Sequence, residues 1–281
     1  MRPRSNLIRR TINQTVMSIS LLTSLVGILM LAWILYEVIS RGAGAFNWSF
    51  FTKPPVPLGE TGGGVANAIL GTLLLTLLAT VIGVPIGLFA GVFLAEFGHQ
   101  SRLSSPVRFL CNILMGTPSI IVGVFVYSLL VVPLGHFSGY AGAIALAVIM
   151  IPLIARTAED MLNLVPDTLR ESALALGAPR WKVTLGVVFR AAKKGLLTGA
   201  LLAIARVSGE TAPLLFTALN SPYWPRSMSQ PISNLTKTIY DYAMSPYADW
   251  HQIAWGASFL ITVSVLLLTI SARVILHERK R

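Results

Sequence analysis

Two ionisable side chains, Arg206 and Glu210, stand inside an apolar stretch that runs from about Leu196 to Leu219. Charged groups are costly inside a membrane, so those that occur there usually serve a function. At a spacing of four residues the two would share one helix face, and pairing lowers the cost of keeping either of them. We therefore expect a substrate-translocation site made by this pair with the hydroxyls of Ser208 and Thr211.

The chemistry that this pair favours is the handling of an anion. A guanidinium donates two parallel hydrogen bonds to a tetrahedral oxyanion and keeps its charge at any relevant pH. A carboxylate beside it would keep the arginine from holding the anion too tightly. The hypothesis is that Arg206 contacts the anion in transit while Glu210 competes for the arginine; the alternative is an ion pair that only fixes helix packing. Pro213 lacks an N–H for the Gly209 carbonyl, so we expect a bend beside the pair.

A second pattern precedes this stretch, in the polar segment 164–179. Thr168 and Glu171 have the spacing of a capping box, and Gly177 followed by Pro179 is typical of a helix end. We predict a short, exposed helix that presents a compact surface to a partner. The expected contact residues are Glu171, Ser172, Ala173, Leu174, Leu176 and Gly177.

The composition indicates that helices in a membrane position both patterns. Of the 281 residues 54% are hydrophobic and 12% are charged, and the mean hydropathy is +0.70, which predicts an all-α membrane protein. The single cysteine excludes an internal disulfide, and the four histidines lack metal-ligand spacing. No phosphate-binding glycine loop of the GxxxxGK[ST] type occurs, and no nucleophile and base pair is evident. We expect no catalytic site, no metal and no cofactor bound by this chain.

Hydrophobic runs predict six transmembrane helices. They cover about 16–39, 66–94, 112–133, 141–154 with flanking residues, 196–219 and 253–276. Residues 1–15 and 277–281 would be tails, and residues 60–276 would form one domain that includes a polar loop at 155–195. Pro85 predicts a kink or a tilt. The run Gly116 to Ser119 predicts a broken or bent turn at the start of the third span.

The distribution of positive charge predicts the orientation. Of the 22 lysines and arginines, 17 lie in residues 1–15, 95–111 and 155–195 or from Arg273 onward, which all fall on one side of a six-span protein. Such asymmetry places both termini and the predicted short helix in the cytoplasm. The net charge of +11 is therefore a topology signal, and we expect no binding of nucleic acid. Tyrosines and tryptophans in residues 220–250 would form either an interfacial belt or a docking surface.

Residues Glu171 to Gly177 resemble the EAA loop of ABC importer permeases, in the last long cytoplasmic loop where that family has it. Residues 175–182 and 205–218 resemble the phosphate-specific permeases of the PstA type, with weaker resemblance at 67–72 and 117–119. The resemblance covers most of residues 60–275. It implies a type I importer permease (MetI-like) fold in a bacterial inner membrane.

The same resemblance implies partners and a function. These are a second, PstC-like permease subunit as heterodimer, a dimeric PstB-like ATPase that binds ATP and Mg, and an extracytoplasmic PstS-like phosphate-binding protein. The chain would then be a permease subunit of a phosphate importer and not itself an enzyme. The open alternatives are a permease for another tetrahedral oxyanion, sulfate or molybdate, and a membrane scaffold or sensor that reports phosphate supply.

Two residues depart from the family pattern. Ser172 replaces an alanine of the EAA motif, which should matter little at a small exposed position. Phe189-Arg190 stands where a Leu-Pro pair usually follows, so we predict a continuous helix from this point into the fifth span.

Overall fold

The computed structural model describes residues 6–57, 62–98 and 101–276, which form helices and no strand. In chain order the α-helices are α1 (Asn6–Gly42), α2 (Trp48–Thr52), α3 (Ala66–Val92), α4 (Ser104–Gly116), α5 (Ser119–Val126), α6 (Val132–Leu134), α7 (Gly139–Asn163), α8 (Asp167–Ala175), α9 (Arg180–Val183), α10 (Phe189–Ser208), α11 (Ala212–Leu215), α12 (Leu235–Ala243) and α13 (Ala248–Leu276). The 3-10 helix η1 (Ala43–Ala45) follows α1, and the π-helical turns η2 (Phe93–Phe97), η4 (Tyr127–Val131) and η5 (Thr184–Val188) follow α3, α5 and α9. The all-α prediction is confirmed.

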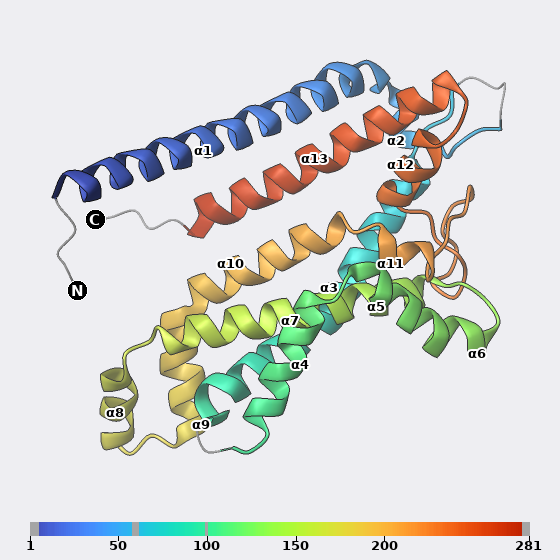
Figure 1. The fold of residues 1–281 in the computed structure, drawn as a ribbon. Coiled ribbons are helices and arrows are strands. Elements are labelled where there is room, and N and C mark those ends of the chain that lie inside the picture. The colour runs from blue at the N-terminus through green and yellow to red at the C-terminus, as the bar shows by residue number, and fades with distance from the viewer. Residues whose placement is uncertain (1–5, 58–61, 99–100, 277–281) are drawn as a thin grey trace.

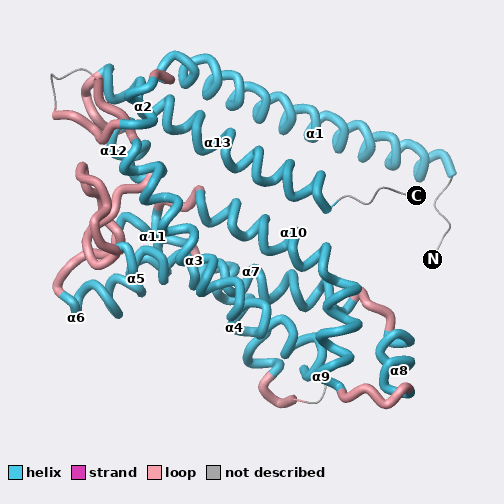
Figure 2. The backbone as a smooth tube through the Cα atoms, turned by 180° about the vertical axis from the view of Figure 1, so that it is seen from behind, coloured by secondary structure: helices cyan, strands magenta, loops and turns pink. Residues whose placement is uncertain are grey.

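The long helices form an elongated bundle with two distinct ends. In Figures 1 and 2, α1 and α13 lie side by side as an antiparallel pair, next to a body built from α3, α7 and α10. We call the end that carries α8, α9 and η2 the coupling end, and the end that carries α2 and α12 the outer end. The start of α1 and the last turn of α13 both lie toward the coupling end (Figure 1).

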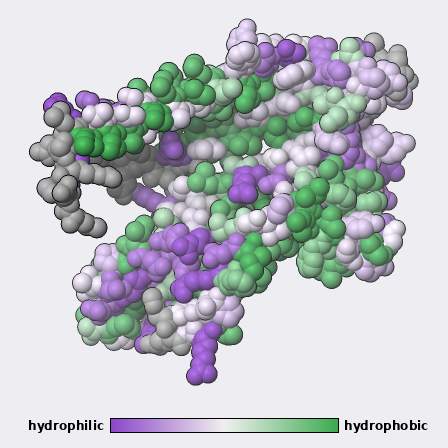
Figure 3. All heavy atoms as spheres, viewed as in Figure 1, coloured by the Kyte–Doolittle hydropathy of each residue, from purple (hydrophilic) through white to green (hydrophobic). Residues whose placement is uncertain are grey.

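The space-filling view agrees with an orientation of these ends across a membrane. In Figure 3 hydrophobic residues gather along α1 and over α4 and α5, whereas hydrophilic residues gather around α8 and α9. Many large apolar side chains are exposed on the long helices, including Leu21 at 71% and Phe89 at 75%. Such exposure is expected where lipid or another subunit covers the surface.

Small residues explain how α3 and α7 pack so closely. A stripe on α3 at four-residue spacing is buried, consisting of Ala79, Gly83, Gly87 and Gly91. Cβ atoms added at Gly87 and Gly91 would clash with Ile154 and Ala158 of α7, and one added at Gly83 would lie only 3.1 Å from Met150. The residue numbers increase in the same direction along both helices, so α3 and α7 run parallel. Stripes of small residues are a common way to bring membrane helices together.

Four helices are long and apolar enough to cross a membrane, or five if the bent pair α4–α5 counts as one, among the described residues. They are Ile8–Ala45, Ala66–Phe97, Gly139–Asn163 and Ala248–Ser271, with the pair Ser104–Gly116 and Ser119–Leu134. The helix expected as the fifth span is not among them. Helix α1 already begins at Asn6, inside the tail expected at 1–15, and residues 1–5 and 277–281 lie outside the described residues. Six spans and cytoplasmic termini stay predictions.

The third expected span has a sharper break than a bent first turn. Helix α4 already begins at Ser104, and the chain turns by 107° before α5. Thr117 is extended, with φ −77° and ψ 131°. A residue before proline disfavours the helical conformation, and Pro118 follows here. The predicted break is confirmed, but a start at 112 is wrong.

The fifth expected span ends earlier than predicted. The backbone is helical without interruption from Arg180 to Ser208, so the continuous helix through Phe189-Arg190 is confirmed. It does not reach Leu219. The N–H groups of Gly209 and Glu210 bond to carbonyls three residues back, at 3.2 and 3.1 Å, which tightens and closes the last turn. The predicted bend is thus a full break between α10 and α11.

Two further segments differ from expectation. Helix α7 runs to Asn163, α8 follows it, and a further helical stretch begins at Arg180. Much of the polar segment 155–195 is therefore helical. Helix α12 lies within what the sequence indicates as an aromatic loop. Its N-terminus is capped by the Asn234 side chain, which accepts from Lys237 N at 2.9 Å.

Candidate translocation site and coupling helix

Arg206 and Glu210 lie at the break between α10 and α11. Arg206 stands in the last turn of α10, where a cation is favoured by the helix dipole. Its Nε lies 3.9 Å from Glu210 Oε1, and the side chains are 59% and 17% exposed. The predicted pairing is therefore present as a long ion pair that leaves most of the guanidinium accessible. The two residues do not share one helix, because α10 ends between them.

The other two expected site residues lie in the same turn. Ser208 Oγ donates to the Ala205 carbonyl at 2.8 Å, so this hydroxyl is bound to its own helix and points back along it. Thr211 precedes α11, and its carbonyl accepts from Leu214 N at 3.1 Å. The structure thus brings Arg206, Ser208, Glu210 and Thr211 together at one helix break; a role in translocation stays a prediction.

The backbone of this break is tied to α12. Thr236 Oγ1 lies 2.9 Å from the Glu210 carbonyl and 2.9 Å from Asn234 Oδ1, and its single proton is donated to one of these two acceptors at a time. The Leu235 N–H in turn donates to Thr72 Oγ1 on α3 at 2.9 Å. Thr72, Asn234 and Thr236 therefore fix the position of the site, although the sequence alone did not single them out.

The short helix expected at the coupling end is α8, and its beginning differs from the prediction. It starts at Asp167, one residue before Thr168, and Pro166 at the N-cap makes no side-chain capping bond. The capping box of Thr168 and Glu171 is therefore wrong. An acidic residue in the first turn suits the helix dipole, and Asp167 provides it.

The C-terminal end of α8 is as predicted. Gly177 has φ +79°, a conformation that glycine adopts at little cost. Its N–H donates to the Leu174 carbonyl at 2.9 Å, and Ala178 N donates to the Ala173 carbonyl at 3.2 Å. These bonds satisfy carbonyls that the helix end would otherwise leave free.

The expected contact residues of α8 are mostly accessible. Five are exposed: Glu171, Ser172, Leu174, Leu176 and Gly177. Leu176 is 89% exposed and Leu174 is 42% exposed. Ala173 differs, because it packs against the buried cluster that contains Val183 and Val188. The surface that α8 and the turn after it offer to a partner therefore includes the exposed leucines Leu174 and Leu176.

Arg170 holds α8 against the rest of the coupling end, and the sequence did not single it out. Its Nη2 lies 2.8 Å from Glu96 Oε1 of η2, and its Nε donates to the same oxygen at 3.1 Å. The side chains of Arg170 and Glu96 are 17% and 10% exposed. A signal existed in the sequence, since Glu96 closes a long apolar run that carries no other charge.

A second ionic cluster lies beside the first. Glu159 of α7 has a side chain only 4% exposed and accepts from Arg108 Nε at 2.7 Å. Arg156 Nη1 lies 3.1 Å from its other oxygen. Arg108 also donates to the Leu94 carbonyl at 3.2 Å. A buried carboxylate needs such partners, and here they tie α4 and α7 to η2.

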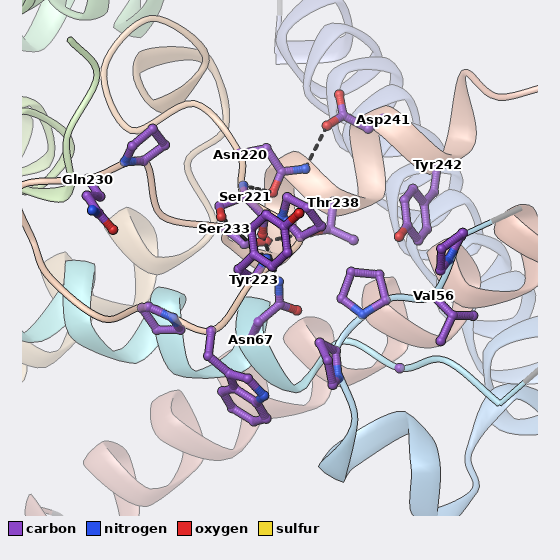
Figure 4. A pocket seen from close by; sticks show the side chains of 18 of the residues that line it. Val56, Asn67, Asn220, Ser221, Tyr223, Gln230, Ser233, Thr238, Asp241 and Tyr242 are labelled. Carbon is purple, nitrogen blue, oxygen red and sulfur yellow. Dashed lines mark hydrogen bonds between the residues drawn. The ribbon is translucent and has the colours of Figure 1, made fainter.

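The outer end contains a hollow of about 1080 Å³, lined by polar, aromatic and proline residues. Asn220 donates to Asp241 Oδ2 at 2.9 Å within it (Figure 4). Tyr242 and Trp250 stack there at 4.6 Å between ring centroids. Burial, together with the charge of Asp241, raises the pKa of the Tyr242 hydroxyl, so this group stays neutral at physiological pH. Tyr242 and Trp250 therefore line a concave surface.

Within the described residues no group of three or more His, Cys, Asp or Glu side chains is arranged to hold a metal ion. The two buried charged clusters at the coupling end consist of arginine–carboxylate pairs, which are suited to structural joints.

The chain is similar in sequence to known transport proteins. A family model described as binding-protein-dependent transport system inner membrane component matches residues 83–277. The phosphate transport system permease protein PstA of Yersinia pestis is 48% identical over 97% of this chain and 92% of its own length. The probable phosphate transport system permease protein PstA of Methanocaldococcus jannaschii is 39% identical over 91% of this chain and 90% of its own.

Solved structures share the fold. A chain of the inward-facing MetNI methionine ABC transporter covers 75% of this chain and 94% of its own length, with a TM-score of 0.63 at 23% identity. A chain of an amino acid ABC transporter crystallised with histidines covers 74% and 89%, with a TM-score of 0.53 at 18% identity. The helices of this chain thus share the overall fold of these two transporter chains.

Proposed function

Because the chain belongs to the family of binding-protein-dependent transport system inner membrane components, among the PstA-type phosphate permeases, we propose that it lines the pathway of an ATP-driven importer of inorganic phosphate. In this proposal it is a multi-pass protein of the bacterial inner membrane. It has no ATPase site of its own, and its role is to move an anion between two sides.

The observation that carries the proposal is the accessible guanidinium of Arg206 at a helix break. Its contact with Glu210 is long, 3.9 Å, so the N–H groups of the fork remain free to donate to phosphate oxygens. The side chain of Glu210 is only 17% exposed, so its carboxylate is held close enough to compete for the arginine. Competition between the carboxylate and the anion lets the site release what it binds.

The partners follow from the same proposal. A PstC-like permease completes the pathway as a heterodimer, and a PstS-like phosphate-binding protein delivers phosphate at the outer end, where the hollow lies. A dimeric PstB-like ATPase binds ATP and Mg and docks on α8. The exposed side chains of Leu174 on α8 and of Leu176 directly after it support this docking, because an apolar patch on a polar surface is suited to a partner's groove.

The mechanism then needs a displacement of α8 that reaches the site. Closure of the ATPase on ATP moves α8, and rigid helices carry that movement to the break between α10 and α11. There a small shift of the Glu210 backbone changes the distance between carboxylate and guanidinium. The pair opens to accept phosphate in one state and closes to expel it in the other.

The experiment is transport by the complete complex in proteoliposomes. We expect ATP-dependent uptake of labelled phosphate, and ATP hydrolysis stimulated by the phosphate-loaded binding protein. Labelled sulfate and molybdate form the comparison panel. Uptake of sulfate or molybdate in preference to phosphate would refute phosphate as the substrate. A complex that hydrolyses ATP and assembles but transports none of the three would refute the transport function.

A further inference from the structure

A buried ion pair between Glu96 and Arg170 connects the coupling helix α8 to the end of α3. We propose that this pair is the mechanical joint through which α8 moves α3, and that α3 carries the movement to the backbone of Glu210. The inference rests on the proposed function, because it explains how an ATPase on α8 acts on the anion site.

The geometry of the joint is that of a rigid anchor. Both Nη2 and Nε of Arg170 donate to the same Glu96 oxygen, at 2.8 and 3.1 Å. The remaining donors bind the Leu162 carbonyl at 2.8 Å, the Val165 carbonyl and Asp167 Oδ1 at 3.0 Å. The guanidinium thus holds the end of α7, the start of α8 and the end of η2 at one point. A planar fork in so many bonds permits little rotation.

The receiving element, η2, is itself fixed on its other side. Arg108 of α4 donates to the Leu94 carbonyl at 3.2 Å and pairs with Glu159 of α7. Isolated π-helical turns often mark functional positions in helices, because they free a carbonyl for an external donor. A displacement delivered to Glu96 is therefore imposed on the whole coupling end of α3.

Helix α3 continues from this joint to the outer end as one element of 27 residues. Its glycine stripe packs directly against α7. Near its first turn Thr72 Oγ1 accepts the Leu235 N–H at 2.9 Å. The hydroxyl of the next residue of α12, Thr236, lies 2.9 Å from the Glu210 carbonyl. Each step of this path is a direct contact.

The covalent route from α8 to the site is less direct. It passes through the turn at Gly177, whose φ of +79° belongs to a tight reversal, and then along α9, η5 and α10. The pair Glu96–Arg170 therefore gives α8 a second connection that bypasses this turn. Removing the pair should leave docking of the ATPase intact and weaken the link between ATP hydrolysis and transport.

The test is the number of ATP molecules hydrolysed per anion transported by the reconstituted complex. The variants are Glu96→Gln, Arg170→Lys and the double variant. Coupling free energies between sites usually correspond to factors of about 5 to 150. We expect the ratio to rise at least about fivefold in each single variant, with copurification of the ATPase unchanged. The double variant should be no worse than either single one, because both remove one joint.

The matched control is Glu37→Gln, which breaks the exposed pair with Arg41 on α1, and its ratio should equal that of the unaltered protein. An unchanged ratio in Glu96→Gln and Arg170→Lys would overturn the joint. So would additive effects in the double variant, because the two residues would then act independently. Loss of assembly in both single variants would also overturn it, because the pair would then only stabilise the fold. If the unaltered complex transports another anion of the panel, phosphate as substrate fails and the ratio is measured with that anion.

Discussion

Replacement of Arg206 by lysine separates a packing role from a substrate role. The charge is retained, while the planar fork that donates two parallel hydrogen bonds is lost. The ion pair itself contributes less than about 1 kcal/mol, because it spans 3.9 Å and the arginine side chain is 59% exposed. Folding and assembly should therefore be unaffected by Arg206→Lys.

Binding of the anion should suffer far more than stability. Loss of one charge-assisted hydrogen bond costs about 1.5–3 kcal/mol, and each 1.4 kcal/mol is a factor of about ten. We expect phosphate uptake at subsaturating concentration to fall about 10-fold to 100-fold. The assay is initial uptake in proteoliposomes, with the melting temperature and subunit yield of the complex measured in parallel.

The control for this prediction is Arg41→Lys, an arginine that pairs with Glu37 at the outer end and lies 5.2 Å from the Trp255 ring centre. The Arg41→Lys variant is expected to take up phosphate at the normal rate. Full uptake by Arg206→Lys in a normally assembled complex would refute the reasoning, because the pair would then act in packing alone. A fall in melting temperature that matches the loss of uptake would refute it as well.

The remaining predictions concern the coupling end and the core. Leu176→Asp should abolish copurification of the ATPase and leave the melting temperature of the permease within about 1 °C, because an 89% exposed side chain adds little to folding; a retained ATPase would count against docking on α8. Gly177→Val should lower the stability of the coupling end by about 1 kcal/mol or more, seen as faster proteolysis near α8, since φ +79° is strained for a branched residue. Gly91→Leu should prevent assembly because its added Cβ lies 2.5 Å from the Ala158 Cβ, whereas Gly27→Leu, with open space around it, should assemble normally; equal yields would contradict the proposed packing.

Much of the fold can be predicted from hydrophobic runs and local stop signals. The glycine at 177 and the continuous helix through Phe189-Arg190 follow from the backbone preferences of the residues present. The capping box predicts a later start of α8 than the structure shows, because Pro166 is the N-cap and the helix begins at Asp167. Helix α12 is not evident from the sequence because it is only 9 residues long and is surrounded by loop-forming residues, although Asn234 is a good N-cap.

The site was located only in part for a related reason. Arg206 and Glu210 are conspicuous, since each is a charge in an apolar run. Arg170 and Glu96 are 74 positions apart in the chain, and no local pattern connects them. A contact of that kind depends on how α3 and α8 meet in space. The sequence therefore indicates the chemistry of a residue more readily than its contact partner far away in the chain.

The antiparallel pair of α1 and α13 carries a consequence for how the chain is inserted. Close packing of the two is evident where α1 ends, with Gly42 lodged against Phe259 and Trp255, while its apolar window is not buried at all. Tethered at one extremity, α1 can enter the lipid first and serve as an anchor while the later helices condense around α3. Truncation of this anchor should spare the compact interior and instead reduce the yield of correctly oriented protein.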